Sequence, residues 1–198
     1  ELTAEENIGR TKDYTGLLFY DDNDLFFYSI PQNKVTRLTS DKDEEVNPML
    51  SPDGKKVAYT KNRDLFVVDV EAAKETRLTN DASDVVYNGY ASWVYMEEII
   101  GRSFKYRAFW WAPNSQMIAF LRFDDTPVPE FPLYRADGVH GELEWEHYPK
   151  PGDPNPIVKM GIVNINPSKV VWIDEDENAD QYTAWPFWTA DSKQLFYQ

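Results

Sequence analysis

The chain has 198 residues, a formal net charge of −14, no cysteine and 15% aromatic residues. The acidic balance argues against nucleic-acid binding, which needs an excess of Lys and Arg, and suits a soluble surface or a cavity that attracts cations. The lack of cysteine excludes disulfides, thiolate zinc sites and cysteine nucleophiles, and no apolar stretch reaches the roughly 20 residues of a membrane helix.

The N-terminal part of the chain contains an internal repeat with a period of 40 residues. The strings Asp24-Leu25-Phe26 and Thr36-Arg37-Leu38-Thr39 recur as Asp64-Leu65-Phe66 and Thr76-Arg77-Leu78-Thr79. The runs around them are short, rich in β-branched and aromatic residues, and separated by turn residues, as in antiparallel hairpins. Four strands in about forty residues is the size of one propeller blade.

A four-residue turn signature occurs three times, beginning at Ser51, Ala112 and Thr189. The first copy is Ser-Pro-Asp-Gly, and in every copy an aromatic residue follows eight positions after the first turn residue. Pro presets φ, Asp hydrogen-bonds to the backbone, and Gly tolerates a left-handed conformation, so the signature predicts a tight turn. A single antiparallel meander is the alternative, but matched residues at a fixed period favour a propeller.

We therefore predict an all-β fold, a partial and open β-propeller of about three to four four-stranded antiparallel blades with one short helix in an insertion. The blades are expected at about residues 8–42, 45–80 and 105–174, with a partial blade from residue 182. A complete propeller closes into a ring, and the chain begins at Glu1 rather than Met. We expect residues 1–198 to be an incomplete N-terminal propeller that self-associates through its open edges.

The first insertion in the repeat, residues 81–106, is expected to contain the helix. Ser92 is a suitable N-cap and Gly101 a suitable end, with Trp93, Met96 and Ile100 on one face.

Two acidic residues, Glu97 and Glu98, are adjacent on this helix and point about 100° apart. An anonymous pair of glutamates is usually a solvated helix face. Here the pair lies beside large apolar residues, and Arg102, Lys105 and Arg107 are near enough in sequence to balance its charge. Two carboxylates suit a primary ammonium, which offers three donors, each charge-assisted bond contributing about 1.5–3 kcal/mol.

The second insertion, residues 124–156, is rich in proline, which excludes a helix and favours an extended arm. A linker and a cover for a sheet edge are alternative roles. His140 and His147 lack ligand-like spacing to a carboxylate cluster and are interpreted as surface residues rather than metal ligands. The acidic run at residues 174–177 is interpreted as a solvated turn, because it lacks the glycine and the alternating spacing of a calcium loop.

Several motifs, in this order, resemble the N-terminal propeller of the dipeptidyl peptidase IV family of serine exopeptidases. The similar segments are Tyr87-Asn88-Gly89, Trp93-Val94-Tyr95-Met96-Glu97-Glu98, Trp110-Trp111-Ala112-Pro113-Asn114, Ile118-Ala119-Phe120, residues 122–129 and residues 148–152. The resemblance implies an eight-bladed propeller joined to an α/β-hydrolase domain outside this chain. It implies no cofactor, a periplasmic or secreted location, and cleavage after a penultimate proline by a Ser, Asp and His triad of the hydrolase.

The resemblance also implies that Glu97 and Glu98 bind the α-ammonium group of a peptide with a free N-terminus, with Trp93, Tyr95 and Arg102 lining the site. The family often has a third acid where this chain has Met96.

Family members usually carry a substrate-binding arginine on a long hairpin arm, whereas the matching hairpin here is the short turn at residues 21–24 without arginine. Arg10 and Arg37 are poor substitutes, so the choice between dipeptide and tripeptide release stays open.

No residue of this chain is expected to be catalytic. The nucleophile elbow of an α/β-hydrolase reads G-x-S-x-G, and the nearest string, Gly101-Arg102-Ser103-Phe104-Lys105, lacks the second glycine. The alternative function is a non-catalytic propeller that serves as a binding or scaffold module. A G-x-S-x-G motif downstream in the parent protein would distinguish the peptidase from the module.

Overall fold

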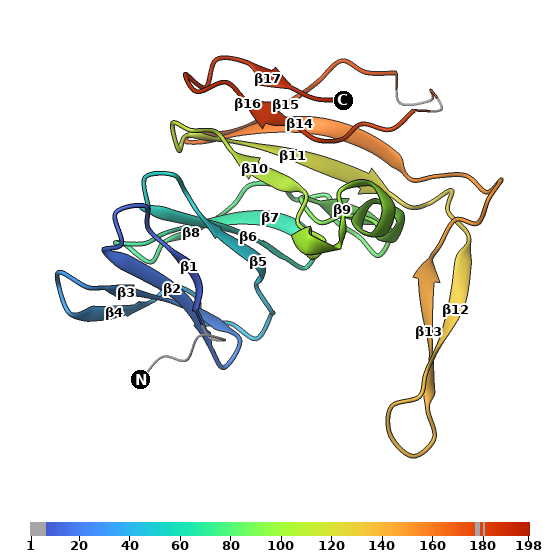
Figure 1. The fold of residues 1–198 in the computed structure, drawn as a ribbon, viewed down its shortest axis with the longest axis horizontal. Helices are drawn as coiled ribbons and strands as arrows, with labels where there is room; N and C mark the ends of the chain where they lie inside the picture. Colours follow the sequence, from blue (N-terminus) through green and yellow to red (C-terminus); the bar gives the residue numbers. More distant parts are fainter. Residues whose placement is uncertain (1–6, 177–178, 180) are drawn as a thin grey trace.

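The computed structural model describes residues 7–176, 179 and 181–198. The described chain forms successive antiparallel sheets, which follow one another from the N-terminus to the C-terminus (Figure 1). Within these ranges no helix is long and apolar enough to cross a membrane.

The first two sheets are meanders of four strands each. The first contains β1 (Asn7–Arg10), β2 (Gly16–Asp21), β3 (Asp24–Ser29) and β4 (Lys34–Arg37). The second contains β5 (Val46–Leu50), β6 (Lys56–Lys61), β7 (Asp64–Asp69) and β8 (Glu75–Arg77). The 40-residue repeat is therefore a repeat of whole sheets.

The third sheet carries both insertions. Its strands are β10 (Phe109–Trp111), β11 (Met117–Asp124), β14 (Ile157–Ile165) and β15 (Ser168–Trp172), with β9 (Val86–Asn88) added to the end of β11. Between β9 and β10 lie the helical turns η1 (Tyr95–Ile99) and η2 (Arg102–Phe104). A last hairpin pairs β16 (Phe187–Trp188) with β17 (Leu195–Phe196). The predicted partial, open propeller of antiparallel blades is confirmed.

The sheets stack face to face. Successive side chains of a strand point to opposite faces of its sheet, so alternate apolar residues fill the interfaces on the two sides. In β6, Val57 and Tyr59 face the first sheet, while Ala58 belongs to the cluster shared with the third sheet. All three residues are fully buried. The second sheet therefore has no solvated face, and its position fixes the sheets on both sides.

The turn signatures bind one blade to the next. The amide of Asp53 in the first signature donates to Ser115 Oγ in the second at 3.1 Å, and the amide of Asn114 donates to Ser192 Oγ in the third at 2.9 Å. Gly54, Ser115 and Ser192 occupy the same position in each turn with φ of 71°, 61° and 60°. The four-residue signature therefore forms the predicted turn and also hydrogen-bonds to the equivalent turn of the next sheet, a contact called here the latch.

The repeated string joins the third and fourth strands of each of the first two sheets by polar contacts. Leu65 N donates to Thr79 Oγ1 at 2.9 Å, and that hydroxyl donates to Asp64 Oδ1 at 2.6 Å. Arg77 forms an ion pair with Asp64, and its Nε donates to the Thr79 carbonyl at 2.8 Å. The Leu–Thr and Arg–Asp contacts recur among Asp24, Leu25, Arg37 and Thr39. The repeat thus conserves this clasp as well as the apolar pattern.

The proline-rich insertion is the antiparallel hairpin of β12 (Glu130–Arg135) and β13 (Glu142–His147), which projects from the rest of the molecule (Figure 1). The predicted extended arm is therefore a two-stranded ribbon. His140 is exposed, as expected. The interpretation of His147 as a surface residue is wrong, because its side chain is 17% exposed and its Nδ1 lies 2.8 Å from the Val128 carbonyl oxygen.

A Thr79→Val substitution tests the clasp. Valine keeps the shape of threonine but leaves the Leu65 amide and the Asp64 carboxylate without the hydroxyl, so we expect a loss of about 1–3 kcal/mol of unfolding free energy. Urea denaturation measures the change, with Thr76→Val on β8 as the matched control. Equal midpoints for the two variants would show that the clasp does not stabilise the sheet.

Candidate functional site

The helical turn that carries the two glutamates is short and tightly wound. Met96 N donates to the Ser92 carbonyl at 3.0 Å, and Ile100 N donates to the Tyr95 carbonyl at 2.7 Å, which closes a π turn. Gly101 ends the helix with φ of 97°, as predicted. Trp93 and Val94 are already helical, so the helix begins directly after Ser92, as predicted, but the Ser92 hydroxyl makes no cap hydrogen bond among the described residues. Such π turns are frequent at functional sites.

Tyr95 anchors the helix to the body of the propeller. Its side chain is 1% exposed, its ring lies edge-on to Phe123 at 4.9 Å, and its hydroxyl accepts a hydrogen bond from Thr183 N at 3.2 Å. Burial raises the pKa of the Tyr95 phenol above its usual value. Tyr95 was expected to line the site, and the structure places it beneath the helix. Met96, at the position of the missing third acid, packs partly buried against the same cluster.

The adjacent glutamates differ in surroundings. The Glu97 side chain is 13% exposed and forms an ion pair with Arg102, whose side chain is 76% exposed. Glu98 is exposed. Lys105 is also exposed, and the Arg107 guanidinium lies over the Phe104 ring at 5.1 Å, where burial lowers its pKa. Among the described residues, the expected charge balance is thus provided by Arg102 through an ion pair with Glu97.

Trp93 lies on a different side of the same segment from the glutamates. Its ring centroid is 4.2 Å from that of Tyr148 at the base of the arm. It also lines a cavity of about 310 Å³, whose lining includes neither Glu97 nor Glu98. The insertion therefore presents the Glu98 carboxylate to solvent, the Glu97 carboxylate to Arg102, and the Trp93 ring to a cavity.

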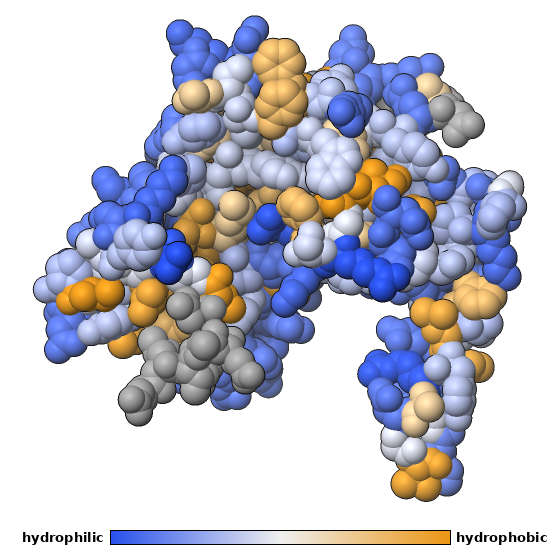
Figure 2. Space-filling model, in the orientation of Figure 1, coloured by the Kyte–Doolittle hydropathy of each residue, from blue (hydrophilic) through white to orange (hydrophobic). Residues whose placement is uncertain are grey.

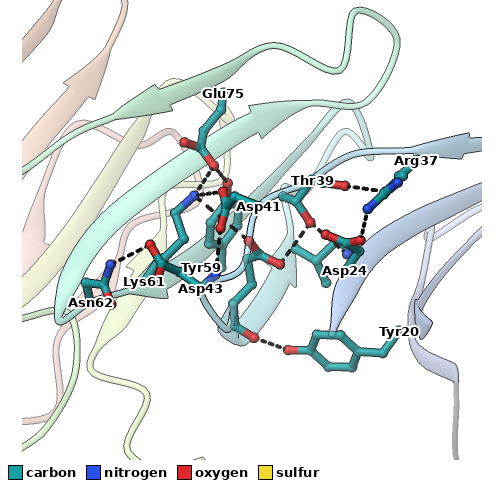
Figure 3. Close-up of polar contacts among 12 residues, drawn as sticks. Tyr20, Asp24, Arg37, Thr39, Asp41, Asp43, Tyr59, Lys61, Asn62 and Glu75 are labelled. Carbon is teal, nitrogen blue, oxygen red and sulfur yellow. Dashed lines mark hydrogen bonds and ion pairs between the residues drawn. The ribbon is translucent and has the colours of Figure 1, made fainter. Parts of the chain in front are cut away.

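A second group of carboxylates lies between the first two sheets (Figure 3). Oxygens of Asp41, Glu45 and Glu75 lie within 4.8 Å of one another, a spacing at which a metal ion can be held. Lys61 lies among them, with its Nζ 2.6 Å from Asp41 Oδ2, 2.7 Å from Glu75 Oε2 and 3.9 Å from Glu45 Oε1. The ammonium group of Lys61 therefore supplies the positive charge that this cluster needs.

Sequence reasoning did not find this cluster, because its members come from a linker, a strand end and an outer strand. The acidic run at 174–177 was the weaker metal-site alternative. Residue 177 lies outside the described residues, and Glu175 instead accepts a hydrogen bond from Thr183 Oγ1 at 2.8 Å. The interpretation of this run as wholly solvated is wrong for Glu175, one of whose oxygens is buried.

Glu45 is the most deeply buried carboxylate of the cluster. Its side chain is fully buried, and Oε2 accepts a hydrogen bond from Thr39 Oγ1 at 2.8 Å. Burial raises the pKa of Glu45 from 4.5 to about 7. Because the folded chain then holds the proton more tightly than the unfolded chain, this residue stabilises the fold below about pH 4.5 and loses that contribution as the pH rises to 7.

A Glu45→Gln substitution should abolish this loss. The amide can still accept the Thr39 hydrogen bond but cannot ionise, so we expect the variant to exceed the wild type at pH 8 by on the order of 1–3 kcal/mol. Urea denaturation at pH 5, 6.5 and 8 measures the profile, and Glu44→Gln, at the exposed neighbouring residue, is the control. A variant less stable than the wild type at pH 8 would contradict the buried-carboxylate explanation.

The sequence profile described as the dipeptidyl peptidase IV (DPP IV) N-terminal region matches residues 14–198. Dipeptidyl peptidase 4 of Felis catus is 35% identical over 125 residues, which cover 60% of this chain and 16% of the cat protein. Inactive dipeptidyl peptidase 10 of Rattus norvegicus is 37% identical over 82 residues, covering 41% of this chain and 10% of the rat protein.

The crystal structure of Porphyromonas gingivalis dipeptidyl peptidase 4 superposes with a TM-score of 0.83 at 22% identity, which shows similarity of fold. The match covers 98% of this chain and 30% of that protein. The chain thus spans less than a third of the length of each of these relatives.

Proposed function

Because the chain belongs to the family of dipeptidyl peptidase IV N-terminal regions, we propose that it is the substrate-docking propeller of a serine exopeptidase. That enzyme removes short N-terminal peptides after proline, and Glu97 and Glu98 bind the substrate's α-ammonium group. A C-terminal α/β-hydrolase domain supplies the catalytic groups, and the enzyme is periplasmic or secreted.

The observation that carries the proposal is the placement of two adjacent carboxylates on a helix fixed to the core. A free amino terminus carries three N–H donors, and two carboxylates can accept from it at once. Tyr95 and Ile100 are 1% and 2% exposed, so the helix has little freedom to move and the carboxylates are held in place before the ligand arrives.

Arg102 is the counter-ion that the substrate replaces. Its side chain is 76% exposed, so releasing it from Glu97 uncovers little apolar surface. With one partner largely in solvent, the single Arg102–Glu97 ion pair is expected to contribute on the order of 1 kcal/mol, less than the several charge-assisted bonds of a bound ammonium. Peptides with an acetylated N-terminus lack the charge and are rejected.

Replacing both Glu97 and Glu98 with Gln in the full-length protein tests the proposal. We expect kcat/KM for a peptide with a free N-terminus and a penultimate proline to fall by about 100-fold, because two charge-assisted bonds of at least about 1.5 kcal/mol each are lost. The control is the double variant Glu71→Gln and Glu142→Gln at exposed positions. Unchanged kinetics would remove the glutamates from the site.

A non-catalytic binding module is the second candidate, favoured by the similarity to a rat protein named inactive dipeptidyl peptidase 10. A binding module and a peptidase can be distinguished by measurement. A module would bind peptides or proteins without hydrolysis, and its parent would lack G-x-S-x-G after this chain.

Self-association through the terminal sheet is part of the proposal. The rings of Phe187 and Phe196 stack at 5.3 Å, and the residues are 59% and 47% exposed. Apolar side chains are visible over β16 and β17 at the top of Figure 2. Sedimentation velocity at rising concentration should show dimers, and Phe187→Ser should weaken them. A chain that stays monomeric at all concentrations would contradict this.

A further inference from the structure

The cavity beside Trp93 has the features of a second binding site. Its volume of about 310 Å³ lies within the range of small-ligand pockets. Five separate segments line it, namely the linker that leads into β5, the end of β6 with its turn, the segment from β9 to η1, the residues just after η2, and the base of the arm. None of the groups that line it belongs to the proposed α-ammonium site except Trp93.

Asp125 is a buried carboxylate of this cavity whose nearest polar side chains are those of Ser92 and Tyr87. The residue is 1% exposed, and among the described residues neither Oδ1 nor Oδ2 has a hydrogen bond of normal geometry. Its backbone is held firmly, because the amide donates to the Val85 carbonyl at 2.8 Å and the carbonyl accepts from Val128 N at 2.8 Å. A buried carboxylate in this state is costly and calls for an explanation.

The Ser92 hydroxyl is the second polar group in this condition. Ser92 is 2% exposed, lines the cavity, and its Oγ has no hydrogen bond of normal geometry within the described chain. Burial raises the pKa of Asp125 to about 6, and weak hydrogen bonding from the Ser92 and Tyr87 hydroxyls offsets only part of that rise. The Asp125 carboxylate and the Ser92 hydroxyl are thus neighbours in the lining of one cavity, and neither has a hydrogen bond of normal geometry among the described residues.

The charge of the cavity is negative. Glu44 and Glu146 join Asp125 in its lining, and burial raises the pKa of Glu146 as well. Arg63 is the basic residue of the lining, and its Nη1 is engaged by the Ser83 carbonyl at 3.0 Å and by Asp84 at 3.2 Å. Because carboxylates outnumber basic groups in the lining, the cavity favours a cationic ligand.

The walls are aromatic and flat. Tyr90 and Tyr106 stack with ring centroids 4.9 Å apart, Tyr87 lies 6.2 Å from Tyr90, and Trp93 completes the lining. Aromatic faces attract cations, and a planar guanidinium stacks on them better than a compact ammonium does. A guanidinium also presents two parallel N–H donors to one carboxylate.

We propose that this cavity binds the guanidinium group of a peptide arginine, with Asp125 accepting two N–H bonds and Ser92 Oγ accepting a third. Neither oxygen of Asp125 has a hydrogen bond of normal geometry among the described residues, so both can accept from a guanidinium in the bidentate geometry, which a lysine ammonium cannot match. The site is independent of Glu97 and Glu98, because it requires no free N-terminus.

Titration with N-acetyl-L-arginine amide, followed by calorimetry at pH 8, tests the proposal. The acetylated probe has no α-ammonium, so failure here is separable from failure of the glutamate site. We expect saturable binding to the wild type and at least tenfold weaker binding of N-acetyl-L-citrulline amide, the neutral isostere. Equal binding of the two probes, or no binding of the arginine probe, overturns the proposal.

Variants locate the binding in the cavity. Asp125→Asn should weaken binding of the arginine probe at least tenfold, and Ser92→Ala, which removes only a hydroxyl, should weaken it several-fold. Asp124→Asn is the matched control, since that carboxylate bonds to Thr126 at the surface, and it should bind as the wild type does. If Asp125→Asn unfolds, Ser92→Ala decides alone. Unchanged affinity in Ser92→Ala and in every folded Asp125 variant, or a loss in the Glu97→Gln, Glu98→Gln double variant, overturns the assignment.

Discussion

Face-to-face packing of one antiparallel sheet on the next is the constraint on which the rest of the structure depends. Each sheet is a meander, so the turns between its first and second strands and between its third and fourth strands lie at the same end of the strands, here called the first edge. The turns between the second and third strands and the linkers between sheets lie at the opposite end of the strands, here called the second edge. The turn signatures latch the first edge through Ser115 and Ser192. The second edge receives both insertions and is where the chain gathers its polar side chains.

That second edge explains why residues distant in sequence meet there. Glu45 comes from a linker between sheets, Lys61 from the end of β6, Trp93 from an insertion in the next linker, and Asp125 from the base of the arm. The position of each of these residues depends on the apolar packing between sheets beneath it, more than on the residues next to it in sequence. The chemistry of this edge therefore depends on the burial of residues such as Tyr59 and Phe120, which touch no ligand.

The fold was largely predictable from sequence, whereas the polar clusters were not. Period, turn residues and strand composition are local signals, and they gave the two repeated sheets, the hairpin turns and the end of the helix at Gly101. The failures share a cause. The sequence places Ser92 correctly before the helix but does not show that its hydroxyl is buried away from the helix amides, and it does not show that His147 contacts the Val128 carbonyl, because both facts depend on residues outside the local segment.

The glutamate pair shows the same limit more sharply. Adjacency of Glu97 and Glu98 is visible in the sequence, as is a neighbouring arginine, but not which carboxylate that arginine holds. In the structure Arg102 binds Glu97, and Glu98 stays exposed.

The two acids are thus unequal before any ligand arrives. An ammonium that binds the pair must displace the exposed guanidinium of Arg102 from Glu97, whereas Glu98 is accessible directly. A net charge of −14 adds a diffuse field that favours such cations over the whole surface. Discrimination between cations then has to come from geometry. Two adjacent carboxylates, one exposed and one partly buried, suit a compact ammonium, whereas a buried carboxylate walled by aromatic rings suits a planar group.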